Sequence, residues 1–204
     1  MKVLRSHLNL ISIILFGSLI RIHYLFYYSG NLNFPNLGGD PCHHYNSAFN
    51  FSKYFIPQND FIFSYWFRHE NLPALIDIYP PGFYFFLGFF MFVFGDSYFI
   101  ARIFNFLIGL LNIFLAYLIG LKIKSKNLGM LSALAVSINI FHIENSTVVM
   151  NVVFSMFVIQ LSILSFLIFY NGKKTWFFIG LITGISYLSY SASQVILICF
   201  VIFL

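Results

Sequence analysis

Long apolar runs dominate this chain of 204 residues, and they leave it few folds to adopt. A helix that crosses a bilayer needs roughly 20 consecutive apolar residues, and several of the runs reach that length. Because 60% of the residues are hydrophobic and only 8% are charged, too little polar surface is present to cover a soluble domain. The sequence predicts an all-α, polytopic transmembrane helical bundle with apolar segments at about 8–28, 83–95, 99–121, 127–141, 147–170, 175–192 and 195–204.

The two ends of the chain carry separate signals. The first apolar run follows Lys2 and Arg5, as the apolar part of a signal peptide would. This run is long enough to span a membrane and no small-x-small cleavage pattern follows it, so we predict an uncleaved first helix. The sequence stops at Leu204 inside an apolar run, so we expect a truncated chain, the N-terminal fragment of a longer protein.

The formal net charge of +5 does not indicate a nucleic-acid partner. In a membrane protein, Lys and Arg collect in the cytoplasmic segments, and this bias accounts for a basic balance. Cys42 and Cys199 are too few to form a disulfide framework. We therefore expect a membrane-lipid environment and no nucleic acid.

Lysines between the apolar runs set the expected topology. Those within residues 122–126 fill one gap, and those at 173–174 fill another. Because basic loops stay in the cytoplasm, both groups and the N-terminus are expected on that side. This arrangement requires the segment 83–95 not to cross, and its length of about 13 residues is well below the roughly 20 of a span. We predict that it is a juxtamembrane or re-entrant helix.

One long polar stretch, residues 29–82, is expected to form a first outer loop that carries juxtamembrane helices. It ends in Tyr79, Pro80 and Pro81, where the prolines impose an extended entry into the next apolar segment and the tyrosine suits the membrane interface. Four of the six acidic residues lie in this loop: Asp40, Asp60, Glu70 and Asp77. If the protein does chemistry, we expect it here.

Asp40 is the first candidate for that chemistry. It follows two glycines and precedes Pro41, which is typical of a tight, exposed turn. One interpretation is a turn or N-cap carboxylate for a helix beginning near His43. The other is a general base at the bilayer surface, where partial desolvation raises the pKa of a carboxyl group into a useful range.

Histidines near Asp40 raise the question of a metal. His43 and His44 follow Asp40 within one turn, and Glu144 lies between two later apolar runs. A carboxylate beside histidines can hold a divalent cation. Adjacent histidines point in different directions on a helix, however, so an ordinary polar face explains this pair equally simply, and Glu144 is also compatible with a solvated turn. A possible divalent metal or acceptor site stays open, and no cofactor is certain.

Two arginines fall within or beside apolar runs. Arg102, at the expected outer start of the segment 99–121, can extend its side chain to water or hold a lipid phosphate with its guanidinium fork. Arg21 lies in the outer part of the first helix, where an unpaired cation is costly. For Arg21 we expect either extension to the interface or a pair with a loop carboxylate.

Several short motifs, taken in order, resemble a known family. The loop opens with Asp-Pro-Cys-His-His before Tyr45, continues to Tyr-Pro-Pro-Gly at 79–82, and is followed by Phe-Gly-Asp-Ser at 94–97 and by Ala-Arg at 101–102. This order resembles the GT-C-type integral-membrane glycosyltransferases. The similarity is greatest to the protein mannosyltransferase-like and aminoarabinose-transferase-like group and to the related RgtA/B/C/D-like domain. It covers essentially residues 1–204, with the outer loop at 29–82.

The resemblance implies transfer of a sugar from a polyprenyl-phosphate donor to a hydroxyl of a glycan, lipid or protein acceptor, with inversion, on the non-cytoplasmic face. The membrane would be the plasma membrane, or the endoplasmic reticulum in a eukaryote. In that family the loop aspartate is the catalytic base, a role that falls to Asp40, and the arginine near the donor phosphate corresponds to Arg102. Many members have acidic residues where this chain has Pro41 and Asn151.

Two alternative functions remain. A lipid-linked carrier or flippase would need a polar path across the bilayer, and the sequence contains hardly any facing intramembrane charges. A catalytically inactive GT-C-like subunit is the other alternative, and Pro41 and Asn151 are the features that favour it.

Overall fold

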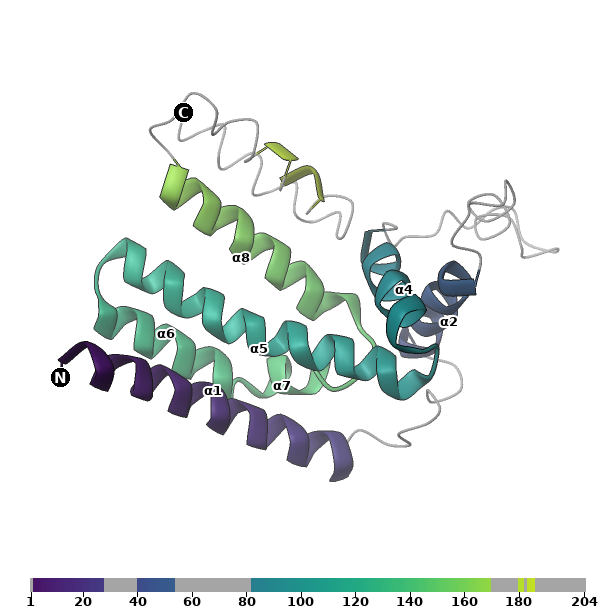
Figure 1. The fold of residues 1–204 in the computed structure, drawn as a ribbon, viewed down its shortest axis with the longest axis horizontal. Helices are drawn as coiled ribbons and strands as arrows, with labels where there is room; N and C mark the ends of the chain where they lie inside the picture. Colours follow the sequence, from purple (N-terminus) through teal and green to yellow (C-terminus); the bar gives the residue numbers. More distant parts are fainter. Residues whose placement is uncertain (1, 28–39, 54–81, 170–179, 182, 186–204) are drawn as a thin grey trace.

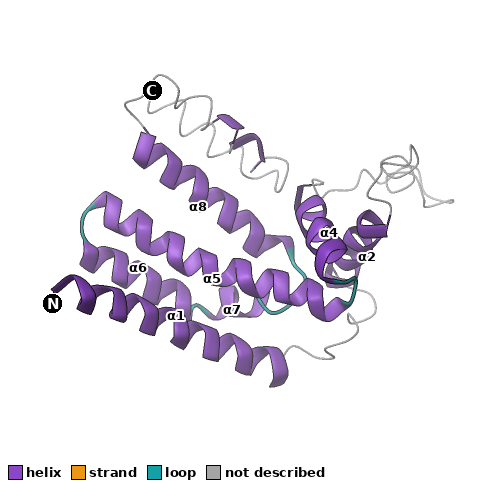
Figure 2. Ribbon diagram, in the orientation of Figure 1, coloured by secondary structure: helices purple, strands orange, loops and turns teal. Residues whose placement is uncertain are grey.

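The computed structural model describes residues 2–27, 40–53, 82–169, 180–181 and 183–185, and every element in these ranges is helical (Figure 2). The helices are α1 (Lys2–Tyr27), α2 (Asp40–Lys53), α4 (Gly82–Phe94), α5 (Tyr98–Ile123), α6 (Lys126–Ile138), α7 (Ile140–Asn145) and α8 (Asn151–Phe169). The predicted all-α membrane fold is confirmed. Tyr79, Pro80 and Pro81, and the predicted segments at 175–192 and 195–204, lie wholly or mostly outside the described residues.

Three of the helices, α1, α5 and α8, are long and apolar enough to cross a membrane, within Leu8–Tyr27, Tyr98–Ile123 and Asn151–Ile168. Their axes run in roughly the same direction, and α5 lies between α8 and α1 (Figure 1). Helix α6 packs against both α5 and α1. The N-terminus of α1, the turn between α5 and α6 and the C-terminal end of α8 all lie at one end of this bundle. Lys2 and the lysines of 122–126 therefore share one end, as the predicted topology requires.

Helix α4 has 13 residues and is among the helices too short to count as a span. It lies at the opposite end of the bundle with α2 packed against it, and it does not run alongside the long helices (Figure 1). Gly88 of α4 permits this packing, because a Cβ atom there would come within 2.9 Å of the carbonyl oxygen of Ala48. We call the region formed by α2, α4 and the adjoining ends of α1, α5 and α8 the α2–α4 end.

Local sequence explains where the helices begin and end. Gly95 has a φ of 114°, a conformation that favours glycine, and it ends α4. Ser97 and Ser125 then act as N-caps of α5 and α6, each accepting a hydrogen bond from the backbone N–H three residues later. Tight contact between Gly120 and Gly129 brings α6 against α5, since a Cβ at Gly120 would lie 2.8 Å from the backbone of Gly129.

Two predicted segment boundaries were wrong. The segment 127–141 is divided at Asn139, which ends α6 and caps α7 by accepting a hydrogen bond from the His142 N–H at 2.9 Å. The segment 147–170 begins as a helix only at Asn151, because residues 146–150 form a connection between α7 and α8. This connection is held by side chains from other helices, as described below.

The topology can be tested by cysteine labelling in vesicles of known orientation, with Cys42 and Cys199 replaced by serine. A cysteine at Lys124 is expected to react only with reagent on the cytoplasmic side, because we predict that α4 does not cross and that the lysine-rich turn stays inside. A cysteine at Tyr27, which is 76% exposed at the other end of α1, is the matched control and should react from the opposite side. Labelling of both from one side would contradict this arrangement.

Candidate active site at the α2–α4 end

Helix α2 begins at Asp40, three residues before the position expected for its start. The backbone of Asp40 therefore lies in the first turn of the helix. The side chains of Asp40 and His43 lie outside the part of the chain whose side chains are described. Their proposed roles consequently depend on where α2 places its first turn.

His44 faces the inside of the α2–α4 pair. It is fully buried, and its Nδ1 lies 3.1 Å from the hydroxyl oxygen of Tyr84. The His44 and Phe83 rings form a T-shaped pair with their centroids 5.5 Å apart. Glu144, the other residue considered for a metal, is exposed on α7. Within the described ranges, no group of three His, Cys, Asp or Glu residues is placed to hold a metal ion.

Tyr45 connects α2 to the start of α5. Its hydroxyl donates a hydrogen bond of 2.7 Å to the carbonyl oxygen of Asp96, and its ring forms a T-shaped pair with that of Tyr98, with the two centroids 5.3 Å apart. Burial and the charge of Asp96 raise the pKa of Tyr45, so the phenol keeps its proton and remains a donor. Asp40 lies five residues earlier, which is roughly 7.5 Å along the helix axis.

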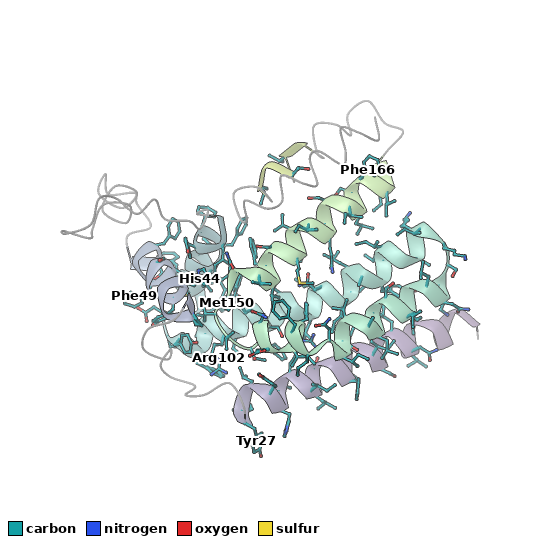
Figure 3. All side chains as sticks on the ribbon, turned by 180° about the vertical axis from the view of Figure 1, so that it is seen from behind. Tyr27, His44, Phe49, Arg102, Met150 and Phe166 are labelled. Carbon is teal, nitrogen blue, oxygen red and sulfur yellow. The ribbon has the colours of Figure 1, made fainter. Side chains whose placement is uncertain are left out.

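Arg102 also contacts the ring of Tyr98. The guanidinium carbon is 5.8 Å from the centre of the Tyr98 ring, within cation–π range. Tyr45, Tyr98 and Arg102 thus form a continuous series of contacts from the first half of α2 into the bundle. Figure 3 shows Arg102 at the same end of the molecule as His44 and Tyr27.

The Arg102 side chain is fully buried and does not extend to water, which was one of its two predicted roles. Its Nε donates to the carbonyl oxygen of Thr147 at 2.7 Å, and its Nη2 donates to that of Leu25 at 3.2 Å. Leu25 is among the last four residues of α1, whose carbonyls have no partner inside the helix. A positive charge at this helix end is also favoured by the helix dipole.

Arg21 is fully buried and so does not extend to the interface, whereas the loop carboxylates predicted as its alternative partners lie outside the described side chains. It donates to the carbonyls of Val136 and Ser137 at the C-terminal end of α6, at 3.3 and 3.2 Å. Its other acceptors are Gly17 O at 2.9 Å, Ser146 Oγ at 3.1 Å and His142 Nδ1 at 2.7 Å. The five N–H groups of this guanidinium are matched by five acceptors, so the buried charge is stabilised without extension to the interface.

His142 joins Arg21 to α5. Since a guanidinium can only donate, Nδ1 of His142 accepts, and the proton of the neutral ring lies on Nε2, 3.2 Å from the side-chain amide nitrogen of Asn112. Asn112 keeps its amide nitrogen on this side because Nδ2 donates to the carbonyl oxygen of Val153 at 2.9 Å. Burial, followed by the charge of Arg21, lowers the pKa of His142 to about 3.

Sequence reasoning missed the polar face of α5 that holds the connection 146–150. Asn105 donates to the carbonyls of Val148 and Met150, at 2.6 and 2.8 Å. Asn112 lies 2.9 Å from the carbonyl of Val153, and Gly109 between them permits Ser146 to approach. The spacing of Arg102, Asn105, Gly109 and Asn112 corresponds to one helix face and was the signal available in the sequence.

The low pKa of His142 makes stability depend on pH. Between about pH 3 and 6.5 the unfolded chain binds a proton that the folded chain does not, so stability decreases as the pH falls through this window. Going from pH 7.5 to 4.5 is expected to cost about 2 to 3 kcal/mol through this one group. The measurement is the apparent Tm in detergent micelles across this range.

His142→Asn is the matched variant for this measurement, because an amide oxygen can accept from Arg21 but does not titrate. It should show a smaller loss of Tm between pH 7.5 and 4.5 than the wild type. Equal pH dependence in both proteins would mean that folding does not lower the pKa of His142.

Comparison with known protein families gives a match over the later part of the chain. A family model described as dolichyl-phosphate-mannose-protein mannosyltransferase matches residues 79–204, which is more than half of the chain. The matched region contains Arg102, Asn105, Asn112 and His142, whereas Asp40 and Arg21 lie before it. No curated protein and no solved structure matches the chain.

Proposed function

The chain belongs to the dolichyl-phosphate-mannose-protein mannosyltransferase family and is a membrane glycosyltransferase of the GT-C kind, and from this we propose that it transfers a sugar from a polyprenyl-phosphate donor to an acceptor hydroxyl at the α2–α4 end. The observation that carries the proposal is the series Tyr45, Tyr98, Arg102, which brings the first half of α2 to a buried guanidinium. This series supports a site in which the proposed base, Asp40, and the proposed phosphate-binding cation, Arg102, lie at the same end of the bundle.

In the proposed reaction Asp40 is the base. The acceptor oxygen attacks the anomeric carbon while the bond from that carbon to the phosphate oxygen breaks, which inverts the configuration. The hydroxyl proton passes to the Asp40 carboxylate, and the bonding electron pair leaves with the polyprenyl phosphate. The start of α2 favours a carboxylate there, because negative charge is stabilised at a helix N-terminus.

Arg102 would stabilise the charge that develops on the phosphate as the sugar leaves. Two of its donors are occupied by the carbonyls of Thr147 and Leu25, which hold the guanidinium in place. Preorganised charge of this kind lowers the barrier because it needs no rearrangement during the reaction. Its burial among apolar helices increases the effect, since water screens it little.

The position of the site suits a lipid-linked substrate. The α2–α4 end lies away from the lysine-rich end of the bundle, and the bias of lysines toward the cytoplasm therefore supports a site on the non-cytoplasmic face. A polyprenyl chain can stay in the bilayer beside the spans while its phosphate reaches the interface. Since His44 packs against aromatic rings of α4, no step of this proposal is assigned to a metal.

A direct assay tests this function. Membranes that contain the full-length protein are incubated with a panel of radiolabelled polyprenyl-phosphate sugars, and transfer to endogenous glycan, lipid and protein acceptors is measured separately. Label in one acceptor class, absent from membranes without the protein, is the expected result. Movement of the intact labelled lipid between leaflets without transfer would favour a carrier instead, and neither activity would favour an inactive subunit.

A further inference from the structure

A closed ring of contacts joins three separate parts of the chain at the α2–α4 end. Arg21 of α1 donates to Ser146 Oγ at 3.1 Å, and the next residue, Thr147, gives its carbonyl to Arg102 Nε at 2.7 Å. Arg102 then returns to α1 through the carbonyl of Leu25 at 3.2 Å. Because Arg21 and Leu25 are four residues apart, they lie on the same face of α1 and complete the ring.

Arg21 is the most constrained member of this ring. It donates to two carbonyls at the end of α6. It also donates to His142, in the last turn of α7, and to Ser146, the residue directly after α7. Its place is further limited by Gly109, where a Cβ would lie 2.6 Å from Ser146 Cβ and 3.5 Å from Arg21 Nε. A displacement of Arg21 must therefore shift Ser146 or leave buried groups without partners.

We propose that Arg21 is a positioning residue for Arg102. By fixing Ser146 it fixes the adjacent Thr147 carbonyl, and this carbonyl orients the guanidinium toward the phosphate of the sugar donor. The inference rests on the proposed function, because it takes Arg102 as the group that meets that phosphate. It assigns a role to a residue of α1 that lies outside the region matched by the family model.

Two variants disturb the ring without touching Arg102. Arg21→Lys keeps the charge at the end of α6, but a single ammonium cannot reach both His142 and Ser146 in the way that a fork does. Gly109→Ala keeps Arg21 and pushes on Ser146 directly. Gly120→Ala is the control on the same helix, since its new Cβ would meet the backbone of Gly129 at 2.8 Å, far along α5 from Gly109.

The first measurement does not depend on activity. The sequence has four arginines, Arg5, Arg21, Arg68 and Arg102, so the Nε–H resonance of Arg102 can be assigned in protein labelled with nitrogen-15 arginine by its loss in Arg102→Lys. Arg21→Lys and Gly109→Ala are expected to shift this resonance, whereas Gly120→Ala is not. An unchanged resonance in both ring variants overturns the inference.

The second measurement separates this inference from the proposed function. Arg21→Lys and Gly109→Ala should raise the KM for the sugar donor about 10- to 100-fold with little change in the KM for the acceptor. A shifted resonance with an unchanged KM for the sugar donor would overturn the positioning role while leaving the assigned reaction intact. If the wild type transfers no sugar from any labelled donor, the proposed function is wrong. The positioning role, which rests on that function, is then wrong as well, whatever the resonance shows.

Discussion

Asp40→Asn is expected to abolish sugar transfer while leaving the amount of protein in the membrane unchanged. Asparagine has nearly the same shape as aspartate, but its amide cannot take the proton of the acceptor hydroxyl. Loss of a positioned general base typically lowers kcat by about 100- to 10,000-fold. The measurement is the initial rate of label transfer at saturating sugar donor, compared with wild type at equal protein.

Asp60→Asn is the matched control, because it removes another carboxylate of the same outer loop. It should transfer at close to the wild-type rate. If Asp40→Asn also keeps the wild-type rate, the base is a different group and the assignment of Asp40 is wrong. If both variants are inactive, the loop as a whole has lost its structure.

The long spans could be predicted from sequence because their signal is local. Helices α1, α5 and α8 each contain a run of at least 18 residues that is predominantly apolar and has few charged side chains, and nothing but a membrane span or a deeply buried helix accommodates such a run. The short α4 was predicted for the same reason, since 13 residues and two preceding prolines limit what the segment can do. These features depend on composition and length alone.

The break at Asn139 could not be predicted in the same way. Asparagine is only a weak signal for a helix end, and here its effect depends on an N-cap bond to His142 and on the guanidinium that meets the end of α6. Arg21 supplies that guanidinium from 115 residues away in the sequence. Partners at this distance are invisible to local patterns.

The candidate site shows the same division. Asp40 and Arg102 were found because short motifs marked them, and their roles stay predictions. The polar groups that hold Arg102, namely the carbonyls of Leu25 and Thr147, belong to the backbone and have no signature in the sequence. The sequence indicated that an unpaired Arg21 in the apolar first helix would be costly. The acceptors of its hydrogen bonds could be identified only from the packed structure.

Arg102→Gln is expected to reduce transfer by about 100- to 1,000-fold, the usual effect of removing one group that stabilises transition-state charge. Glutamine is uncharged and cannot bond Thr147 and Leu25 together, so a lower apparent Tm is expected as well. Arg102→Lys should have a transfer rate and an apparent Tm between those of the wild type and Arg102→Gln, since lysine keeps a charge but lacks the guanidinium fork. The rate of transfer and the apparent Tm are measured for both variants.

A phosphate probe distinguishes the catalytic part of this effect from the structural part. Unlabelled polyprenyl phosphate, the product that leaves, should inhibit the wild type, and this inhibition should weaken in Arg102→Gln because the cation that binds the phosphate is gone. Ser125→Ala, which removes the N-cap of α6 at the far end of the bundle, should lower the Tm by a similar mechanism of lost hydrogen bonding but leave the inhibition unchanged. Equal inhibition of wild type and Arg102→Gln would show that this guanidinium holds α1 to the α7–α8 connection and does not meet the phosphate.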